Sequence, residues 1–397
     1  MDLGCHRRLL PGRFAVVATH CAPPGHVVSA WQSWRDAPSA TPSRGNIPGM
    51  TISMPFLSSL SSLTAAPACR RWALVGLCLL SGASWAANKQ AHSHAAAKPA
   101  EAKAAKAPVS CPPLPAPFSQ ELFSSAAEQA ADRGFLWKIT KGDHSSYLYG
   151  TFHAGKAEWM APGPKIQQAL DATDVTGVEI NPLDPAIQRE MATVTQGVKR
   201  NLPAELQARL KTRWAAECLP EAALGSAPPE IQALSLTFLA GRRDGLQPSF
   251  GTEIMLAVLA RSADRPVVSL ESASGQLSVL LGSSDAESAN LVNRTLSEIE
   301  RGQTRRILSR VAQIWEQGDL DALEHYADWC DCLKTPLDRS QMKKLMDDRN
   351  PALADRVDGL HTDGKKVFAA VGSLHMVGPT GLPKLLEQRG YQVERLR

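Results

Sequence analysis

The sequence predicts an α/β fold: a central mixed sheet with flanking helices and a helical insert. Three observations support this class. From residue 120 onward, apolar β-type runs alternate with helical segments, two of those runs end in the same Gly-x-x-His pattern, and long helical segments separate the early strands from the last ones. Strands that alternate with helices are typical of a sheet packed between helices.

The first elements of this domain form a predicted β-hairpin. The β-type runs "GFLWKIT" and "SSYLYGT" are separated by "KGDH", which is a turn sequence. A short helix over residues 166–172 and an apolar strand, "DVTGVEI", follow.

The helical insert is predicted in two parts, residues 183–250 and 284–345. Between them, the helix "GTEIMLAVLARSA" precedes a β-branched strand, "RPVVSLE". Within the second part, apolar residues recur at the helical period up to a stop at Gly318: Ile307, Leu308, Val311, Ile314 and Trp315. The chain ends with the strand "KKVFAAVGSLH", the helix "GLPKLLEQRG" and the strand "YQVERLR".

The N-terminal part of the chain is predicted to lie outside this domain. Residues 1–49 are rich in Pro, Arg, Ser and Trp without a clear period, so we expect a non-native or disordered extension, with Met50 or Met54 as a candidate initiator. Residues 87–119 are rich in Ala, Lys and Pro and are expected to form an extended linker. The folded domain is then expected over residues 120–397.

Residues 50–86 are typical of a secretory signal peptide. Arg70 and Arg71 form a basic flank, residues 72–80 form a short apolar segment, and Ala-Ser-Trp-Ala at 83–86 resembles a cleavage site with small residues at its first and last positions. The sequence therefore predicts an exported protein, either periplasmic or extracellular.

Charge and cysteine content narrow the possible partners. The formal net charge of +4 is small and scattered, which argues against a nucleic-acid partner. No stretch after Ala87 is long and apolar enough to span a bilayer. Four cysteines follow the signal, so one or two disulfides are expected with open connectivity: Cys111, Cys218, Cys330 and Cys332.

Four polar side chains follow the predicted strands. His153 follows "SYLYGTF", Glu179 follows "DVTGV", Glu271 follows "RPVVSL", and His375 follows "VFAAVGSL". In open α/β sheets, ligands bind outside the carboxyl ends of the strands, so these residues are expected to meet in one pocket.

Two imidazoles and a carboxylate are a donor set for a divalent metal ion, which lowers the pKa of bound water from about 15.7 to roughly 7. A glycine three residues before each histidine lets the backbone turn or approach closely. Each feature also has a simpler interpretation. A lone Gly-x-x-His fits a structural histidine, and a glutamate at a strand end fits a helix cap.

The sequence also resembles the TraB/GumN family, which includes the animal TIKI proteases, over roughly residues 130–397. The resemblance rests on four segments: "SYLYGTFHAG", "GVEINPLD", "GTEIMLAVLARSADRPVVSLESASGQL" and "DDRNPALADRVDGLHTDGKKVFAAVGSLHMVGPTGLPKLLEQRGYQVERL". It implies an α/β domain of the EreA/ChaN-like superfamily architecture with a metal-dependent hydrolase site. By position it assigns His153 and His375 to the paired motifs, with Gly150 and Gly372 as their glycines.

The resemblance also matches Glu179 to the acid of the second strand and Glu271 and Gln276 to the family's "LE…Q" element. Arg349 and Asn350 match the "RN" that precedes the last strand. Arg349 would stabilise an oxyanion or orient a carboxylate, and the simpler interpretation is a surface salt bridge.

The leading hypothesis is an exported, metal-dependent hydrolase that is peptidase-like and acts on a peptide or small-molecule substrate. His153 and His375 would hold Mn, Co or Zn together with Glu179 or Glu271, and the other acid would act as the general base. The helical insert would form a wall or lid that selects the substrate. The alternatives are a haem- or iron-binding protein without catalysis and a non-catalytic scaffold.

Overall fold

The computed structural model describes residues 110–220 and 227–397. The predicted extension, the signal peptide and the linker as far as residue 109 lie outside the described residues. Within them the fold is α/β, as predicted from the sequence.

A mixed sheet of six strands forms the centre of the domain, in the order β4-β3-β5-β2-β1-β6. Its strands are β1 (Phe135–Lys141), β2 (His144–Thr151), β3 (Val175–Val178), β4 (Val267–Ser269), β5 (Val367–Gly372) and β6 (Gln392–Arg395). The four strands β2 to β5 run parallel, and β1 pairs antiparallel with both β2 and β6. The carboxyl ends of the four parallel strands therefore meet at one edge of the sheet.

The apolar sequence of β5 suits its place in the middle of the sheet. All six of its residues are buried, because β2 and β3 flank it and helices cover both faces. A strand covered on both faces reads as a continuous apolar run instead of an alternating one, and "VFAAVG" has that character. The register pairs Thr151 with Gly372 and Val178 with Ala370, which aligns the strand ends.

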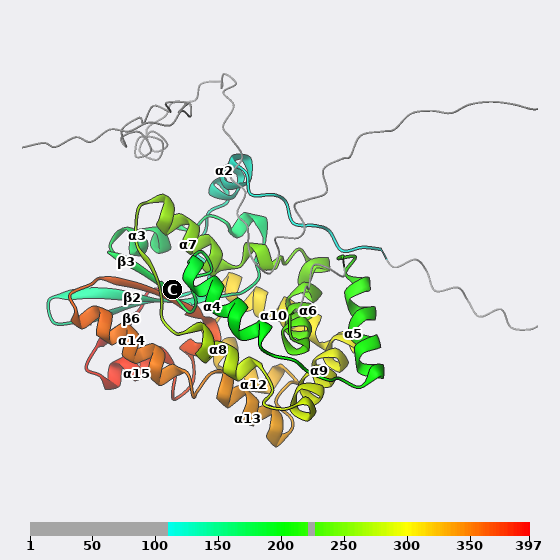
Figure 1. Ribbon diagram of the computed structural model, residues 1–397. Coiled ribbons are helices and arrows are strands. Elements are labelled where there is room, and N and C mark those ends of the chain that lie inside the picture. Colours follow the sequence, from blue (N-terminus) through cyan, green and yellow to red (C-terminus); the bar gives the residue numbers. More distant parts are fainter. Residues whose placement is uncertain (1–109, 221–226) are drawn as a thin grey trace, which may run out of the picture. The chain divides into compact units, whose positions relative to one another are not determined.

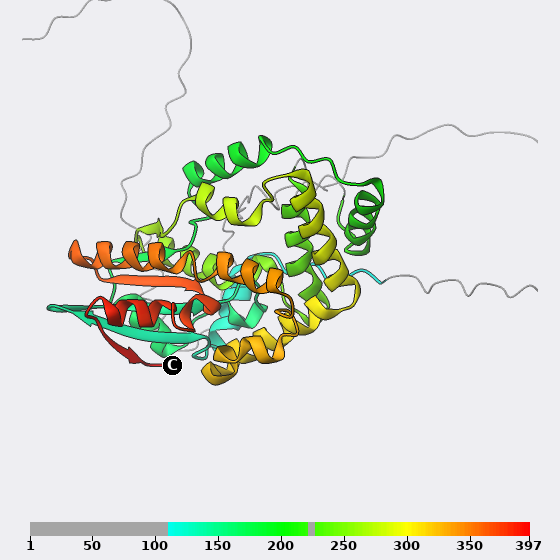
Figure 2. The same cartoon turned by 90° about the horizontal axis from the view of Figure 1, so that it is seen from below.

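Helices cover the sheet and extend beyond it. α7 (Thr252–Ser262) packs on β3 and β5, whereas α14 (Asn350–Thr362) and α15 (Leu382–Gln388) pack on the opposite face (Figure 1). The predicted insert is helical and lies beyond the carboxyl ends of β2 and β5 (Figures 1 and 2). Its helices include α4 (Pro185–Gln196), α5 (Ala204–Ala216), α6 (Pro229–Leu239), α9 (Asp285–Glu300), α10 (Gln303–Gln317), α11 (Leu320–Glu324), α12 (Tyr326–Trp329) and α13 (Pro336–Leu345). Helix α8 (Ala273–Leu280) lies between the two predicted parts.

The ends of the remaining elements follow from local sequence. Helix α2 (Gln120–Glu128) begins at Ser119, whose hydroxyl accepts a hydrogen bond from the Leu122 amide, and α3 (Pro164–Asp171) begins with a proline. Helix α10 ends before Gly318, the stop predicted from the sequence. Gly318 has a φ of 68°, a left-handed conformation that favours glycine. None of the helices in the described part of the chain combines the length and the apolar character that a bilayer crossing requires.

The last ten residues of the predicted linker, 110–119, lie against the domain. Cys111 forms a disulfide with Cys218. The buried guanidinium of Arg242 donates hydrogen bonds to the carbonyls of Pro112 and Pro113. The other two cysteines, Cys330 and Cys332, pair with each other.

Gly155 joins the loop after β2 to the loop before α7. Its N–H and C=O exchange hydrogen bonds of 2.9 and 2.7 Å with Gln247, and a Cβ at this position would lie 1.9 Å from the Phe250 carbonyl oxygen. Gly155→Ala is therefore expected to lower the free energy of unfolding by about 3 kcal/mol, through overpacking and weakened hydrogen bonds.

Urea unfolding monitored by circular dichroism measures this loss. The matched control is Gly359→Ala inside α14, where a Cβ would meet nothing within 4 Å. That variant is expected to raise stability by up to about 1 kcal/mol, because alanine favours a helix interior. Equal effects of the two substitutions would contradict the close backbone approach at Gly155.

Candidate active site

The edge of the sheet where β2, β3 and β5 end brings the predicted histidines and one glutamate together. A Cβ built on Gly372 would lie 3.1 Å from Glu179 Oε1, 3.5 Å from His153 Nε2 and 3.6 Å from His375 Cδ2. Three side chains that are remote in sequence thus surround one point. Gly372 leaves that point open, so the glycine three residues before His375 serves a close approach.

A carboxylate that the sequence interpretation missed holds His153. Glu253, the second residue of α7, lies with Oε1 2.9 Å from His153 Nδ1 and accepts a hydrogen bond from the Thr151 hydroxyl. Because Nδ1 faces a carboxylate, it carries a proton, and Nε2 is directed to the point beside Gly372. A glutamate in the first turn of a helix is common, and its sequence position alone gave no sign of this role.

Asn350 orients the second histidine. Its amide nitrogen donates to the Thr380 carbonyl at 2.8 Å, so its carbonyl oxygen faces His375 Nδ1 at 2.5 Å. His375 Nδ1 therefore carries the proton, and Nε2 is left as an acceptor. The Arg349 guanidinium lies 3.3 Å from that nitrogen.

Arg349 joins the two strand-end glutamates. It donates to Glu179 Oε2 at 2.8 Å and to both carboxylate oxygens of Glu271, one of them at 3.1 Å. Gln276 donates to the same two carboxylates, and the Gly372 amide donates to Glu179 Oε1 at 2.8 Å. The Arg349 side chain is only 12% exposed, so the surface salt bridge considered from the sequence does not describe it.

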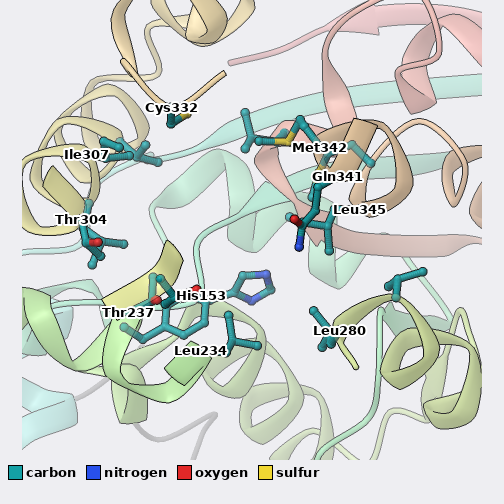
Figure 3. Close-up of a pocket in the computed structure, with 18 of the residues that line it drawn as sticks. His153, Leu234, Thr237, Leu280, Thr304, Ile307, Cys332, Gln341, Met342 and Leu345 are labelled. Atoms are coloured by element: carbon teal, nitrogen blue, oxygen red, sulfur yellow. The ribbon is translucent and has the colours of Figure 1, made fainter. Parts of the chain in front are cut away.

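The site opens into a cavity of about 410 Å³ between the sheet edge and the helical insert. Glu179, Arg349 and both histidines belong to its lining, whereas Glu271 lies outside it, behind Arg349. Figure 3 shows the His153 ring directed into the space between Leu234 and Thr237 on one side and Gln341 and Leu345 on the other. A volume of this size is typical of small-molecule sites, which span about 300–1,000 Å³.

Comparison with known proteins gives the family. The sequence profile of the TraB/PrgY/gumN family matches residues 135–395. The chain belongs to this family. It is 27% identical to the uncharacterized protein YbaP of Shigella flexneri over 247 residues, covering 62% of this chain and 89% of that protein. It is 26% identical to YbaP of Escherichia coli (strain K12) over 267 residues, covering 63% and 96%. No solved structure gives a significant match.

In this TraB/PrgY/gumN protein, burial and neighbouring charges shift the pKa values of the site in opposite directions. Burial lowers the pKa of His375 to about 4. Against the cost of burial, the Glu253 carboxylate raises the pKa of His153 to about 9. Although burial favours the neutral acid, His375, His153 and Arg349 lower the pKa of Glu179 to about 2. At neutral pH the metal-free site therefore holds an anionic Glu179, a cationic His153 and a neutral His375.

These shifts predict how the stability of the metal-free protein depends on pH. The pKa of His153 in the folded protein is about 9, above its ordinary value of 6.5. The contribution of protonated His153 to the free energy of unfolding is therefore fully present below pH 6.5 and is lost as the pH rises to about 9. In His153→Gln this alkaline decrease in the free energy of unfolding is expected to disappear. Urea unfolding with a chelator across this pH range measures the effect, and an unchanged decrease in the variant would assign it to another group.

Lowering the pH is expected to destabilise the metal-free protein through His375 and Glu179. The folded pKa of His375 lies below its ordinary value of 6.5, so its contribution is present above pH 6.5 and is lost as the pH falls to about 4. Glu179 adds a further loss between pH 4.5 and about 2. Stability of the metal-free protein is therefore expected to peak near pH 6.5.

The donor set fits a borderline divalent metal ion. Glu253 and Asn350 hold both imidazoles through Nδ1, as is common for metal-ligating histidines. His153 Nε2 faces the point beside Gly372, whereas His375 Nε2 lies 3.3 Å from the Arg349 guanidinium. Glu179 supplies a carboxylate oxygen at the same point. Among the described residues, no group of three or more His, Cys, Asp or Glu side chains has its donors already set for a metal ion.

Proposed function

We infer that this TraB/PrgY/gumN protein is an exported, metal-dependent hydrolase that cleaves peptide bonds. One observation carries the proposal. Two imidazoles, each held at Nδ1 by its own hydrogen-bond acceptor, meet beside an anionic glutamate at the base of an open cavity, where His153 presents Nε2 and His375 presents its Cδ2 edge. Export is supported by the two disulfides, since such bonds form and persist in oxidising compartments.

His153, His375 and Glu179 are the residues that would hold the metal ion, and His and carboxylate donors suit Mn, Co or Zn. When bound, the ion supplies Lewis acidity and a water of lowered pKa. Glu253 and Asn350 fix the tautomers of the two histidines.

Arg349 is placed to bind the oxygen of the peptide carbonyl as negative charge develops there. It lines the cavity, and a planar guanidinium is an effective donor to such an oxygen. Glu271 lies behind Arg349 and accepts two of its hydrogen bonds. Burial raises the pKa of Glu271, but its place outside the cavity favours a positioning role over that of general base.

Metal content and hydrolysis test the proposal together. Wild-type protein dialysed against Mn, Co or Zn is expected to retain metal and to cleave peptides, whereas the double variant His153→Ala, His375→Ala is expected to lose both properties. His325→Ala is the matched control, because that side chain is 59% exposed and does not line the cavity. Equal metal content in the wild type and the double variant would overturn the proposed ligands.

Haem binding is the second candidate, favoured by the apolar character of the cavity walls. The charged pair of Arg349 and Glu179 at the base of the cavity counts against it, since an apolar macrocycle would then cover buried charges. An absorbance spectrum of the purified protein separates the two, because bound haem gives an intense Soret band.

A further inference from the structure

The walls of the cavity are built from apolar stripes of the helical insert. Helix α10, for example, contributes Thr304, Ile307, Leu308 and Val311, which recur at intervals of three and four residues on one helix face. The apolar lining of α6 is Ala233, Leu234 and Phe238, and that of α13 is Met342 and Leu345, whereas α9 contributes mostly polar or charged residues. Such stripes normally pack against one another in a core, but here they face an open volume of about 410 Å³ (Figure 3). Apolar surface left in an open cavity favours an apolar ligand.

The apolar surface begins beside the proposed catalytic groups. The edge of the Phe238 ring meets the His153 imidazole with 5.8 Å between ring centres. Leu345, which also lines the cavity, accepts a hydrogen bond from Arg349 through its carbonyl. A group held between Phe238 and Leu345 would therefore lie next to the bond that is cleaved.

Polar groups among the apolar ones suit a peptide better than a long acyl chain. Thr237, Thr304 and Gln341 all line the cavity (Figure 3), and the Gln341 amide makes no hydrogen bond to the described residues. A peptide backbone needs such partners when it leaves water, whereas a hydrocarbon chain does not.

The charged residues of the lining disfavour an acidic ligand. Arg294 and Asp338 form a salt bridge of 3.4 Å and neutralise each other. Glu298 has no salt bridge or hydrogen bond to the described residues, and burial raises its pKa. Glu298 therefore gives an acidic ligand no positively charged partner.

We propose that the cavity binds a large apolar side chain of a peptide substrate, of the leucine, methionine or phenylalanine class, beside the scissile bond. This assignment rests on the proposed hydrolase function and adds its substrate class. Leu234 and Phe238 on α6 and Leu345 on α13 determine the specificity.

Blocked peptides of the form acetyl-Ala-Ala-X-Ala-Ala-amide test the assignment, with X as Leu, Phe, Ala or Asp. Mass spectrometry identifies the cleaved bond and gives kcat/KM. The values for Leu and Phe are expected to exceed that for Ala by at least about tenfold, the usual effect of filling an apolar pocket, and Asp is expected to be the poorest. Equal rates for Leu and Ala would overturn the proposal.

The second experiment fills part of the cavity by enlarging one of the side chains that line it. Leu234→Trp is expected to lower the ratio of kcat/KM for the Leu and Phe peptides to kcat/KM for the Ala peptide by about tenfold. Leu337→Trp is the matched control, because Leu337 is 64% exposed, and it is expected to keep the preference. If Leu234→Trp does not fold by circular dichroism, Thr237→Phe fills the same space, since Thr237 also lines the cavity.

Calorimetric binding of the same peptides separates this proposal from the proposed function. If no peptide is cleaved but Leu and Phe peptides bind tighter than Ala and lose that advantage in Leu234→Trp, the hydrolase proposal fails and the cavity assignment stands. If peptides are cleaved without regard to X, the hydrolase proposal stands and the cavity assignment fails.

Discussion

Replacing Glu179 by glutamine is expected to lower kcat/KM for peptide hydrolysis by about 10²- to 10⁴-fold, the usual loss when a group acting on the reacting atoms is removed. The Glu179 carboxylate lies beside both imidazoles at the point left open by Gly372. Glutamine has the same shape and still accepts the hydrogen bond from the Gly372 amide. It loses the charge that holds Arg349 and that would bind a metal ion.

Glu298→Gln is the matched control, because it makes the same change elsewhere in the cavity lining. Its kcat/KM for a peptide with a neutral side chain is expected to stay within about threefold of the wild type. Urea unfolding shows whether Glu179→Gln remains folded, with an expected loss of about 1–3 kcal/mol from the weakened contact with Arg349. Full activity in folded Glu179→Gln would place the chemistry elsewhere.

The positions of the site residues could be predicted because the strands carry strong local signals. The apolar runs before His153 and His375 are long enough to be assigned as strands, and parallel strands place their carboxyl ends at one sheet edge. The Gly372 position shows why the pattern includes a glycine, since a Cβ there would lie against Glu179 and both histidines. Local sequence therefore predicted which of these side chains lie together at this edge of the sheet.

The groups that orient the histidines could not be predicted in the same way. Glu253 follows a glycine and a threonine at the start of an apolar helix, where an acid is explained by the helix dipole alone. Its partner His153 is 100 positions away, and hydrogen bonds between Phe152 and Thr252 and between Gly155 and Gln247 bring the two segments together. Asn350 was noted as part of a motif, but its hydrogen bond to His375 required the fold.

The helical spacing of apolar residues could not predict the cavity. The stripe of Ile307, Leu308 and Val311 indicates that one face of α10 is covered, and a core and a ligand cavity produce the same spacing. Ile314 and Trp315 of the same helix are fully buried in the main core, whereas Ile307 borders the cavity. Which part of a stripe is core and which is cavity depends on where the other helices lie.

Removing the Cys111–Cys218 disulfide is expected to lower the free energy of unfolding by about 4 kcal/mol. The bond joins residues separated by 107 positions, and closing a loop of about 100 residues restricts the unfolded chain by roughly 4.7 kcal/mol in the loop-entropy relation. The folded state changes little in Cys111→Ser, Cys218→Ser, because Arg242 still binds the carbonyls of Pro112 and Pro113.

The second disulfide is the matched control, because Cys330 and Cys332 are separated by only two positions. The same relation gives roughly 1.5 kcal/mol for so short a loop, so Cys330→Ser, Cys332→Ser is expected to unfold at a clearly higher urea concentration than the first double variant. Equal losses for the two pairs would show that stabilisation comes from contacts in the folded state instead of from the restricted unfolded chain. The contrast matters for the site, because the long loop includes β2, β3 and therefore His153 and Glu179. Loss of this disulfide is therefore expected to lower the stability of the segment that holds the proposed metal ligands as well as that of the whole fold.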